Sequence, residues 1–163
     1  MFSDTITLFN HYQSRLGDTW YPTILHNVHL DMDKAAIIAK YGPESSDNAM
    51  LHVKYAVEDS KKMVGVKKII DGEWVISKKQ WLSPKEWHDA PNDNYSNLLT
   101  FNDCENFDFL MLGEWEGGEE PVSDNDYTEG FYHQLNKEHD YVFSITAVGG
   151  PYKTIPHFEI MGR

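Results

Sequence analysis

Basic residues are missing from a long part of this sequence. No lysine or arginine occurs between Glu86 and Asn136, and this 51-residue span contains 13 of the 26 acidic residues of the 163-residue chain. The formal net charge is −12. Because each contact with a nucleic-acid phosphate normally requires a lysine or arginine, the composition argues against a protein that grips DNA with its whole surface.

Cysteine and long apolar segments are also scarce. Cys104 is the single cysteine, so the chain cannot form an internal disulfide, which fits folding in a reducing cytosol. No run approaches the ~18 consecutive apolar residues that a membrane-spanning helix needs. The opening residues lack the basic and apolar regions of a signal peptide. We therefore expect a soluble protein that is made in the cytoplasm and has no membrane partner.

Motifs for catalysis and ligand binding are absent as well. The sequence contains no HExxH or paired CxxC, no GxSxG, no glycine-rich phosphate loop and no EF-hand loop. His29, Asp31 and Asp33 would share one side of a strand and could ligate a metal, but polar residues at a sheet edge are the more common explanation. His133 and His139 fit the end of a helix, where the helix dipole favours histidine without any function. We expect no catalytic, cofactor-binding or metal-binding residues, and we predict that the protein is not an enzyme.

Short apolar segments separated by turn signals predict a mainly β chain. The runs from Thr5 to Phe9 and from Trp20 to Leu30 predict an opening hairpin, with Ile24, His26, Val28 and Leu30 on one face. Asp71-Gly72 predicts a second hairpin, because glycine readily accepts the positive φ of a type I′ turn. Further strands are expected over Met50–Val57, Phe107–Trp115, Tyr141–Val148 and Ile155–Ile160, with a turn at Gly149-Gly150-Pro151.

Two short helices are also expected. The sequence Ser83-Pro84-Lys85-Glu86 is a capping-box pattern with proline at the first helical position, so a helix should run toward Ala90. Asp126 is predicted to cap a second helix, with Tyr127, Phe131 and Leu135 on one face. Lys34 to Lys40 is ambiguous between helix and strand. We predict one domain over residues 1–163, a small antiparallel β-barrel or sandwich with one or two short helices.

Charge is segregated along the chain. The segment from Lys54 to Lys85 carries eight of the 14 basic residues against four acids, and it directly precedes the acidic span. Opposed patches of this kind provide complementarity between copies that pack head to tail. The residues predicted to form subunit contacts or to line a channel are Lys61, Lys62, Lys67, Lys68, Lys78, Lys79, Glu114, Glu116, Glu119 and Glu120.

Three stretches resemble one known group of proteins. The opening Asp4-Thr5-Ile6-Thr7-Leu8-Phe9-Asn10, with Trp20-Tyr21-Pro22-Thr23-Ile24-Leu25 and His29, is similar to the first hairpin of tailed-bacteriophage neck proteins. The segment from Phe107 to Glu114 resembles their strand that leads into a Gly-Glu turn. The ending from Tyr152 to Arg163 resembles their closing strand. The family comprises head-completion "stopper" and minor capsid proteins.

This resemblance implies a structural virion protein without catalysis or cofactor. It would form a homo-oligomeric ring at the head–tail connector, or neck, between the portal or adaptor and the tail proteins, and it would close or gate the DNA channel. DNA would pass nearby without specific binding, since a wall of carboxylates offers phosphates no partners.

Two other classes of function stay open on the sequence. The acidic span could imitate DNA and so inhibit a host nucleic-acid enzyme. Alternatively, the carboxylates and the five tryptophans could serve a small carbohydrate-binding or hydrolase module. The tryptophans are Trp20, Trp74, Trp81, Trp87 and Trp115.

Overall fold

The opening hairpin is the longest pairing in the fold. In the computed structural model, which describes residues 2–32, 49–103 and 107–163, β1 (Asp4–Ser14) pairs antiparallel with β2 (Gly17–Met32). The predicted hairpin is confirmed, but the predicted face of β2 is wrong. Asn27 takes a positive φ of 54° at a register shift, so Leu25 joins Val28 and Leu30 in one core cluster. Ile24 is also fully buried but lies outside that cluster. The predictions for Asp33, Lys34 to Lys40 and Cys104 lie outside the described residues.

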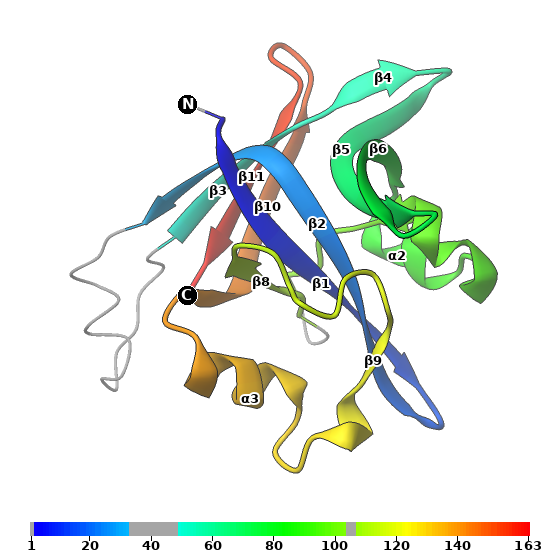
Figure 1. Cartoon of the computed structure of the whole chain (residues 1–163). Coiled ribbons are helices and arrows are strands. Elements are labelled where there is room, and N and C mark those ends of the chain that lie inside the picture. Colours follow the sequence, from blue (N-terminus) through cyan, green and yellow to red (C-terminus); the bar gives the residue numbers. More distant parts are fainter. Residues whose placement is uncertain (1, 33–48, 104–106) are drawn as a thin grey trace.

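Six strands close into an antiparallel barrel, which confirms the predicted fold class. The order runs from β1 through β8 (Phe109–Leu112), β10 (Val142–Tyr152), β11 (His157–Gly162) and β3 (Ala49–Lys54) to β2, which pairs again with β1 (Figure 1). A closed barrel leaves none of these strands as a free edge over its paired length. Among the described residues, no helix is long and apolar enough to cross a membrane.

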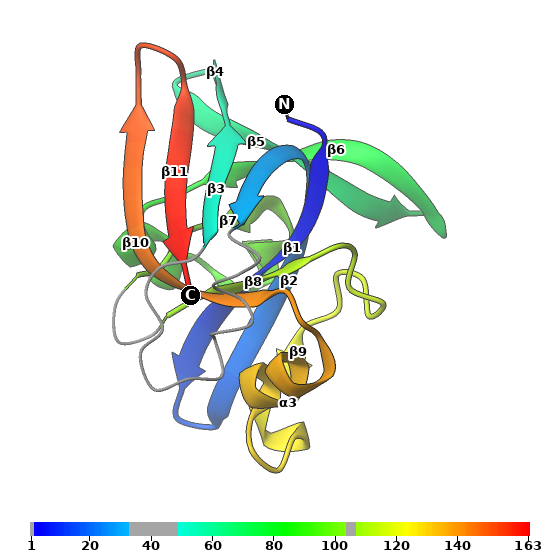
Figure 2. The same cartoon turned by 90° about the vertical axis from the view of Figure 1, so that its left-hand side faces the viewer.

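A second group of strands leaves the barrel from the middle of β2. There, β5 (Lys61–Ile70) pairs with Ile24 and Leu25, and β6 (Glu73–Trp81) pairs with β5 over eight residue pairs. Both Asp71 and Gly72 have positive φ, which confirms the predicted tight turn. We call β5 and β6 together the arm; it extends away from the barrel in Figure 2. Short strands complete the sheet: β4 (Ala56–Glu58), β7 (Leu98–Leu99) and β9 (Val122–Ser123).

Helices cover two places on the barrel. Helix α2 (Pro84–His88) starts at the predicted capping box, with the Ser83 and Glu86 bonds both present, and a 3-10 helix (Asn92–Asn97) follows it. Helix α3 (Phe131–Glu138) starts later than predicted, and the predicted Asp126 cap is wrong. Asp126 lies instead in a 3-10 turn (Asp124–Asp126), and the Asp124 carboxylate accepts the Phe131 backbone N–H at 2.9 Å.

Successive side chains of β1 and β8 point to opposite sides of the barrel wall, so the core has an inner and an outer part. On β1 and β8, Leu8 and Leu110 point into the barrel, whereas Phe9 and Phe109 point outward and are covered by Phe131 of α3. A third cluster under α2 contains Trp87, Tyr95 and Leu98. The predicted phenylalanine-rich strand before Trp115 is therefore buried on both faces, although β8 is shorter than expected.

The end of the chain corrects one further prediction. β10 does not stop at Gly149-Gly150-Pro151 but runs through it to Tyr152, with a register shift against β11 between Gly149 and Tyr152. The turn falls at residues 153–156 instead. An irregularity within a strand and a true turn use the same glycine and proline residues, so the composition alone did not separate them.

Candidate functional site

The arm carries apolar side chains at its surface. Ile70 is 50% exposed and Ile76 is 68% exposed, and Trp74 and Ile69 are 38% and 42% exposed. Ile69 lies opposite Trp74, and Lys67 lies opposite Ile76, so Lys67, Ile69, Trp74 and Ile76 share one face of the arm. Ile70 lies opposite Glu73 and therefore belongs to the other face. Such a cluster rimmed by charges is typical of a surface that contacts another molecule.

The predicted lysines all lie on the arm, but their surroundings differ. Lys61 and Lys78 are exposed, and the Lys78 ammonium lies 2.8 Å from the Glu58 carboxylate of β4. Lys62 lies over the Trp81 ring at 5.9 Å. Lys68 donates to the Asn97 side chain at 3.0 Å. All six lysines therefore lie on β5 and β6, and their role in subunit contacts stays a prediction.

The predicted acidic residues lie in the segment that follows β8, and part of that segment touches the arm. Glu114 forms an ion pair with Lys67, and a carboxylate oxygen of Glu119 accepts the Ile69 backbone N–H at 3.3 Å. Glu116 and Glu120 are exposed. Some of the basic and acidic residues thus pair within one chain, rather than lying on opposite sides of it.

Lys79 differs from the other lysines because its side chain is buried. It is 3% exposed, and its ammonium donates to the Thr23 hydroxyl at 2.7 Å. Burial lowers the pKa of Lys79 to about 8, while the nearby Glu119 carboxylate acts in the opposite direction. It lines a cavity of about 200 Å³ together with Tyr21, Pro22, Tyr95, Ser96, Glu119 and Pro121. Its ammonium is therefore not part of the surface that a second subunit would meet.

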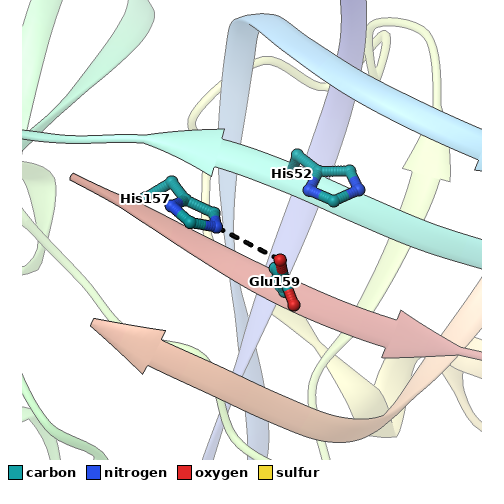
Figure 3. A group of neighbouring side chains, drawn as sticks. All are labelled: His52, His157 and Glu159. Atoms are coloured by element: carbon teal, nitrogen blue, oxygen red, sulfur yellow. Dashed lines mark hydrogen bonds and ion pairs between the residues drawn. The ribbon is translucent and has the colours of Figure 1, made fainter. Parts of the chain in front are cut away.

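Three side chains with metal-ligating atoms meet on the outer face of β3 and β11. They are His52, His157 and Glu159, and their ligand atoms all lie within 4.8 Å of one another (Figure 3). His157 Nε2 lies 3.2 Å from Glu159 Oε1. All three residues are half-buried. The sequence analysis missed this group, although His157 and Glu159 stand at the two-residue spacing that places strand side chains on one face.

The His157 ring is held by bonds to both nitrogens. Nδ1 contacts the Ile155 carbonyl oxygen at 2.5 Å, and Nε2 faces the Glu159 carboxylate. These two contacts raise the pKa of His157, because both stabilise the charged ring. The Tyr152 ring stacks on His157 with 5.0 Å between the ring centroids.

The metal candidate considered from the sequence lies beside this group. His29 stands opposite His52 in the β2–β3 pairing, with 5.8 Å between the ring centroids, and its Nδ1 is 3.9 Å from Asp4. Asp31 is exposed on the same strand. Within the part of the chain that the structure describes, the set that could hold a metal ion consists of the β3 and β11 residues.

A buried carboxylate joins the barrel to the segment before β8. Asp108 is fully buried, and its oxygens accept hydrogen bonds from the His11 and Asn102 backbone N–H groups, both at 2.8 Å. The Asn10 and Asn102 side chains donate to it as well, at 2.8 and 3.1 Å. Burial raises the pKa of Asp108 to about 7, although the four donors favour the ionised form. These four hydrogen bonds connect Asp108 to β1 and to Asn102, so the carboxylate has a structural role.

The tryptophans do not form one groove. Trp20 and Trp87 are 3% and 1% exposed and belong to different core clusters. Trp81 and Trp115 are half-buried, and Trp74 lies on the arm. The residues proposed for a carbohydrate-binding module are therefore spread over the core and the arm.

The protein is a six-stranded barrel from which the β5–β6 hairpin projects with exposed apolar side chains. The whole chain, residues 1–163, matches a family of unknown function (DUF6751), so the protein belongs to that family. Neither a curated protein nor a solved structure matches it.

Proposed function

We propose that this protein is a non-catalytic structural subunit that assembles with copies of itself into a ring, as a head–tail connector component of a tailed-phage particle. The observation that carries the proposal is the apolar face of the arm, where Ile69, Trp74 and Ile76 are 42%, 38% and 68% exposed. The sequence resemblance to neck proteins supplies the setting, and the barrel is the fold class which that resemblance implies.

The arm is suited to contact a neighbour because it is joined to the barrel at one end and extends away from it at the other. It joins the barrel where Lys67 and Val66 of β5 pair with Ile24 and Leu25 of β2. The β5–β6 hairpin extends away from the barrel (Figure 2). Covering one large aliphatic side chain contributes about 1.5–3 kcal/mol. Ile76, with Ile69 and Trp74 on the same face, would therefore account for a substantial part of the free energy of a subunit contact.

Charge supports the same arrangement. Lys61 and Lys78 on the arm are exposed, and so are Glu116 and Glu120 in the segment after β8. In a ring the contact is heterologous, so the arm of one copy meets a different surface of the next copy. Opposed charges on those two surfaces set the orientation of the contact.

Imaging of the purified full-length chain tests the proposal. Mass photometry and negative-stain microscopy should show closed rings, and Ile76→Asp should shift the population to single subunits. Leu16→Asp is the matched control, because Leu16 is 93% exposed at the β1–β2 turn, away from the arm. Rings should survive that change.

The opposite results would overturn the proposal. If the chain stays monomeric both alone and in its native particle, the arm does not form a subunit contact. If that monomer also blocks a DNA-binding enzyme, the acidic segment acts as a DNA mimic instead.

A further inference from the structure

We propose that His52, His157 and Glu159 bind a divalent transition-metal ion, with zinc as the ion to test, on the outer face of β3 and β11. The proposal rests on the convergence of two imidazoles and one carboxylate whose ligand atoms lie within 4.8 Å of one another. It goes beyond the proposed structural role and does not depend on it.

The strands hold the three side chains in register. His157 and Glu159 are two residues apart on β11 and so leave the same face, and His52 lies directly opposite Glu159 on β3. β11 and β3 pair without interruption from His157 and Lys54 to Gly162 and Ala49. Both strands belong to the closed barrel, so its backbone hydrogen bonds fix the relative positions of the three Cα atoms (Figure 3).

The donor types fit zinc. Two histidines and a glutamate form a ligand set that holds zinc while leaving one position open. The His157 Nδ1 contact with the Ile155 carbonyl is the outer contact that orients a ligating imidazole and presents Nε2. Nε2 points at Glu159 Oε1, 3.2 Å away. Ligand bonds of about 2.0–2.2 Å place ligand atoms about 3.4 Å apart, so small rotations of these half-buried side chains close the set around an ion.

A surface depression adjoins two of the three residues. A cavity of about 270 Å³ adjoins His157 and Glu159 and is lined further by Tyr152, Lys153, Thr154 and Ile155. This space admits water or a small ligand as the fourth partner of the ion. The site is therefore formed by one chain and needs no second copy.

Calorimetric titration of the chelator-treated full-length protein with zinc chloride tests the inference. One equivalent of zinc should bind, and His52→Ala, His157→Ala and Glu159→Gln should each weaken the affinity at least about tenfold. His139→Ala is the matched control, because His139 is exposed and lies just after α3. Its affinity should stay within about twofold of the unchanged protein, since it lies outside the ligand set.

A second readout separates ligation from folding. Titration with cobalt chloride should give a visible absorption band of a low-coordinate site, and the three ligand variants should lose it while keeping the thermal unfolding midpoint of the metal-free protein. Failure of the unchanged protein to bind zinc would overturn the inference. So would an equal loss of affinity in His139→Ala, which indicates scattered surface histidines. Neither result affects ring formation, so the two proposals fail separately.

Discussion

In the barrel, Ile160 of β11 lies opposite Leu51 of β3, and both side chains are fully buried. On the arm, Ile76 lies opposite Lys67 in an equally regular pair, yet 68% of Ile76 is exposed. The difference comes from what covers each face. Barrel strands have partners on both sides and enclose their own core, whereas β6 has β5 on one side and only a two-pair contact with β7 on the other. The barrel encloses its own apolar side chains, whereas the arm leaves an apolar face exposed, which is the surface that we propose a neighbour covers.

Removing a core aromatic should produce the largest effect. Phe158 is fully buried and touches Tyr55, Trp81 and Phe101. We expect Phe158→Ala to lower the free energy of unfolding by about 3–5 kcal/mol, because it leaves a cavity that the closed barrel cannot collapse. Urea denaturation measures the loss. Phe158→Leu, which keeps more of the volume, should cost clearly less, and equal costs would mean that the barrel interior is not tightly packed.

The Asp108 network should come next. Each carboxylate oxygen of Asp108 accepts two N–H groups. In Asp108→Asn an amide NH₂ replaces one of these oxygens, so its N–H groups are buried against the N–H groups that the oxygen accepted. We expect a loss of about 3 kcal/mol in the free energy of unfolding. Asp126→Asn is the control, since Asp126 is exposed, and should change stability by less than about 0.5 kcal/mol. A tolerated Asp108→Asn would show that the carboxylate is not needed in the barrel.

Titration of Asp108 gives a pH-dependent effect that is smaller for each pH unit. Burial raises the pKa of Asp108 from 3.8 to about 7, so the native state holds the proton more tightly than the unfolded state. Its stabilising contribution is therefore complete below pH 3.8 and is lost as the pH rises through about 7. Between those values, the stability difference between the unchanged protein and Asp108→Asn should fall by at most about 1.4 kcal/mol per pH unit. A difference that stays level or grows with pH would show that the four donors outweigh burial.

Local signals in the sequence predicted local structure well. The Asp71-Gly72 turn and the Ser83 capping box depend on neighbours within a few residues, and both are present. Asp126 was a plausible helix cap by the same rules. It failed because Asp124, from a preceding 3-10 turn, reaches the first N–H group of α3 through a turn geometry that the residue spacing does not specify.

Local sequence patterns could not predict contacts between segments that are distant in the sequence. His52 and Glu159 meet only because β3 and β11 pair in one particular register, and a shift by one residue would send one of them to the other face. The burial of Lys79 likewise depends on its position against Thr23 of β2. The order of charges along the chain predicted a basic surface from Lys54 to Lys85. It could not show that Lys67 forms an ion pair with Glu114 of the same chain.

The base of the arm offers a test of local capping. The Ser83 hydroxyl accepts the Glu86 backbone N–H at 3.4 Å, and Glu86 in turn accepts the Ser83 backbone N–H at 3.3 Å. We expect Ser83→Ala to cost about 1 kcal/mol in the free energy of unfolding, because the Glu86 backbone N–H loses its acceptor, the Ser83 hydroxyl. Ser83→Asp should restore most of it. Equal losses for both would place the effect in packing near α2 rather than in the cap.

The arm itself should show the smallest effect on folding and the sharpest contrast with the barrel. Ile76→Ser removes an exposed side chain that encloses no core, so in dilute, monomeric protein the free energy of unfolding should change by less than about 0.5 kcal/mol. The same change should weaken self-association, because the apolar area covered by a neighbour is lost. Urea denaturation and concentration-dependent mass photometry on one preparation separate the two quantities. If Ile76→Ser destabilised the monomer as strongly as Phe158→Ala, the arm would be part of the folded core, and its exposed face would no longer indicate a partner.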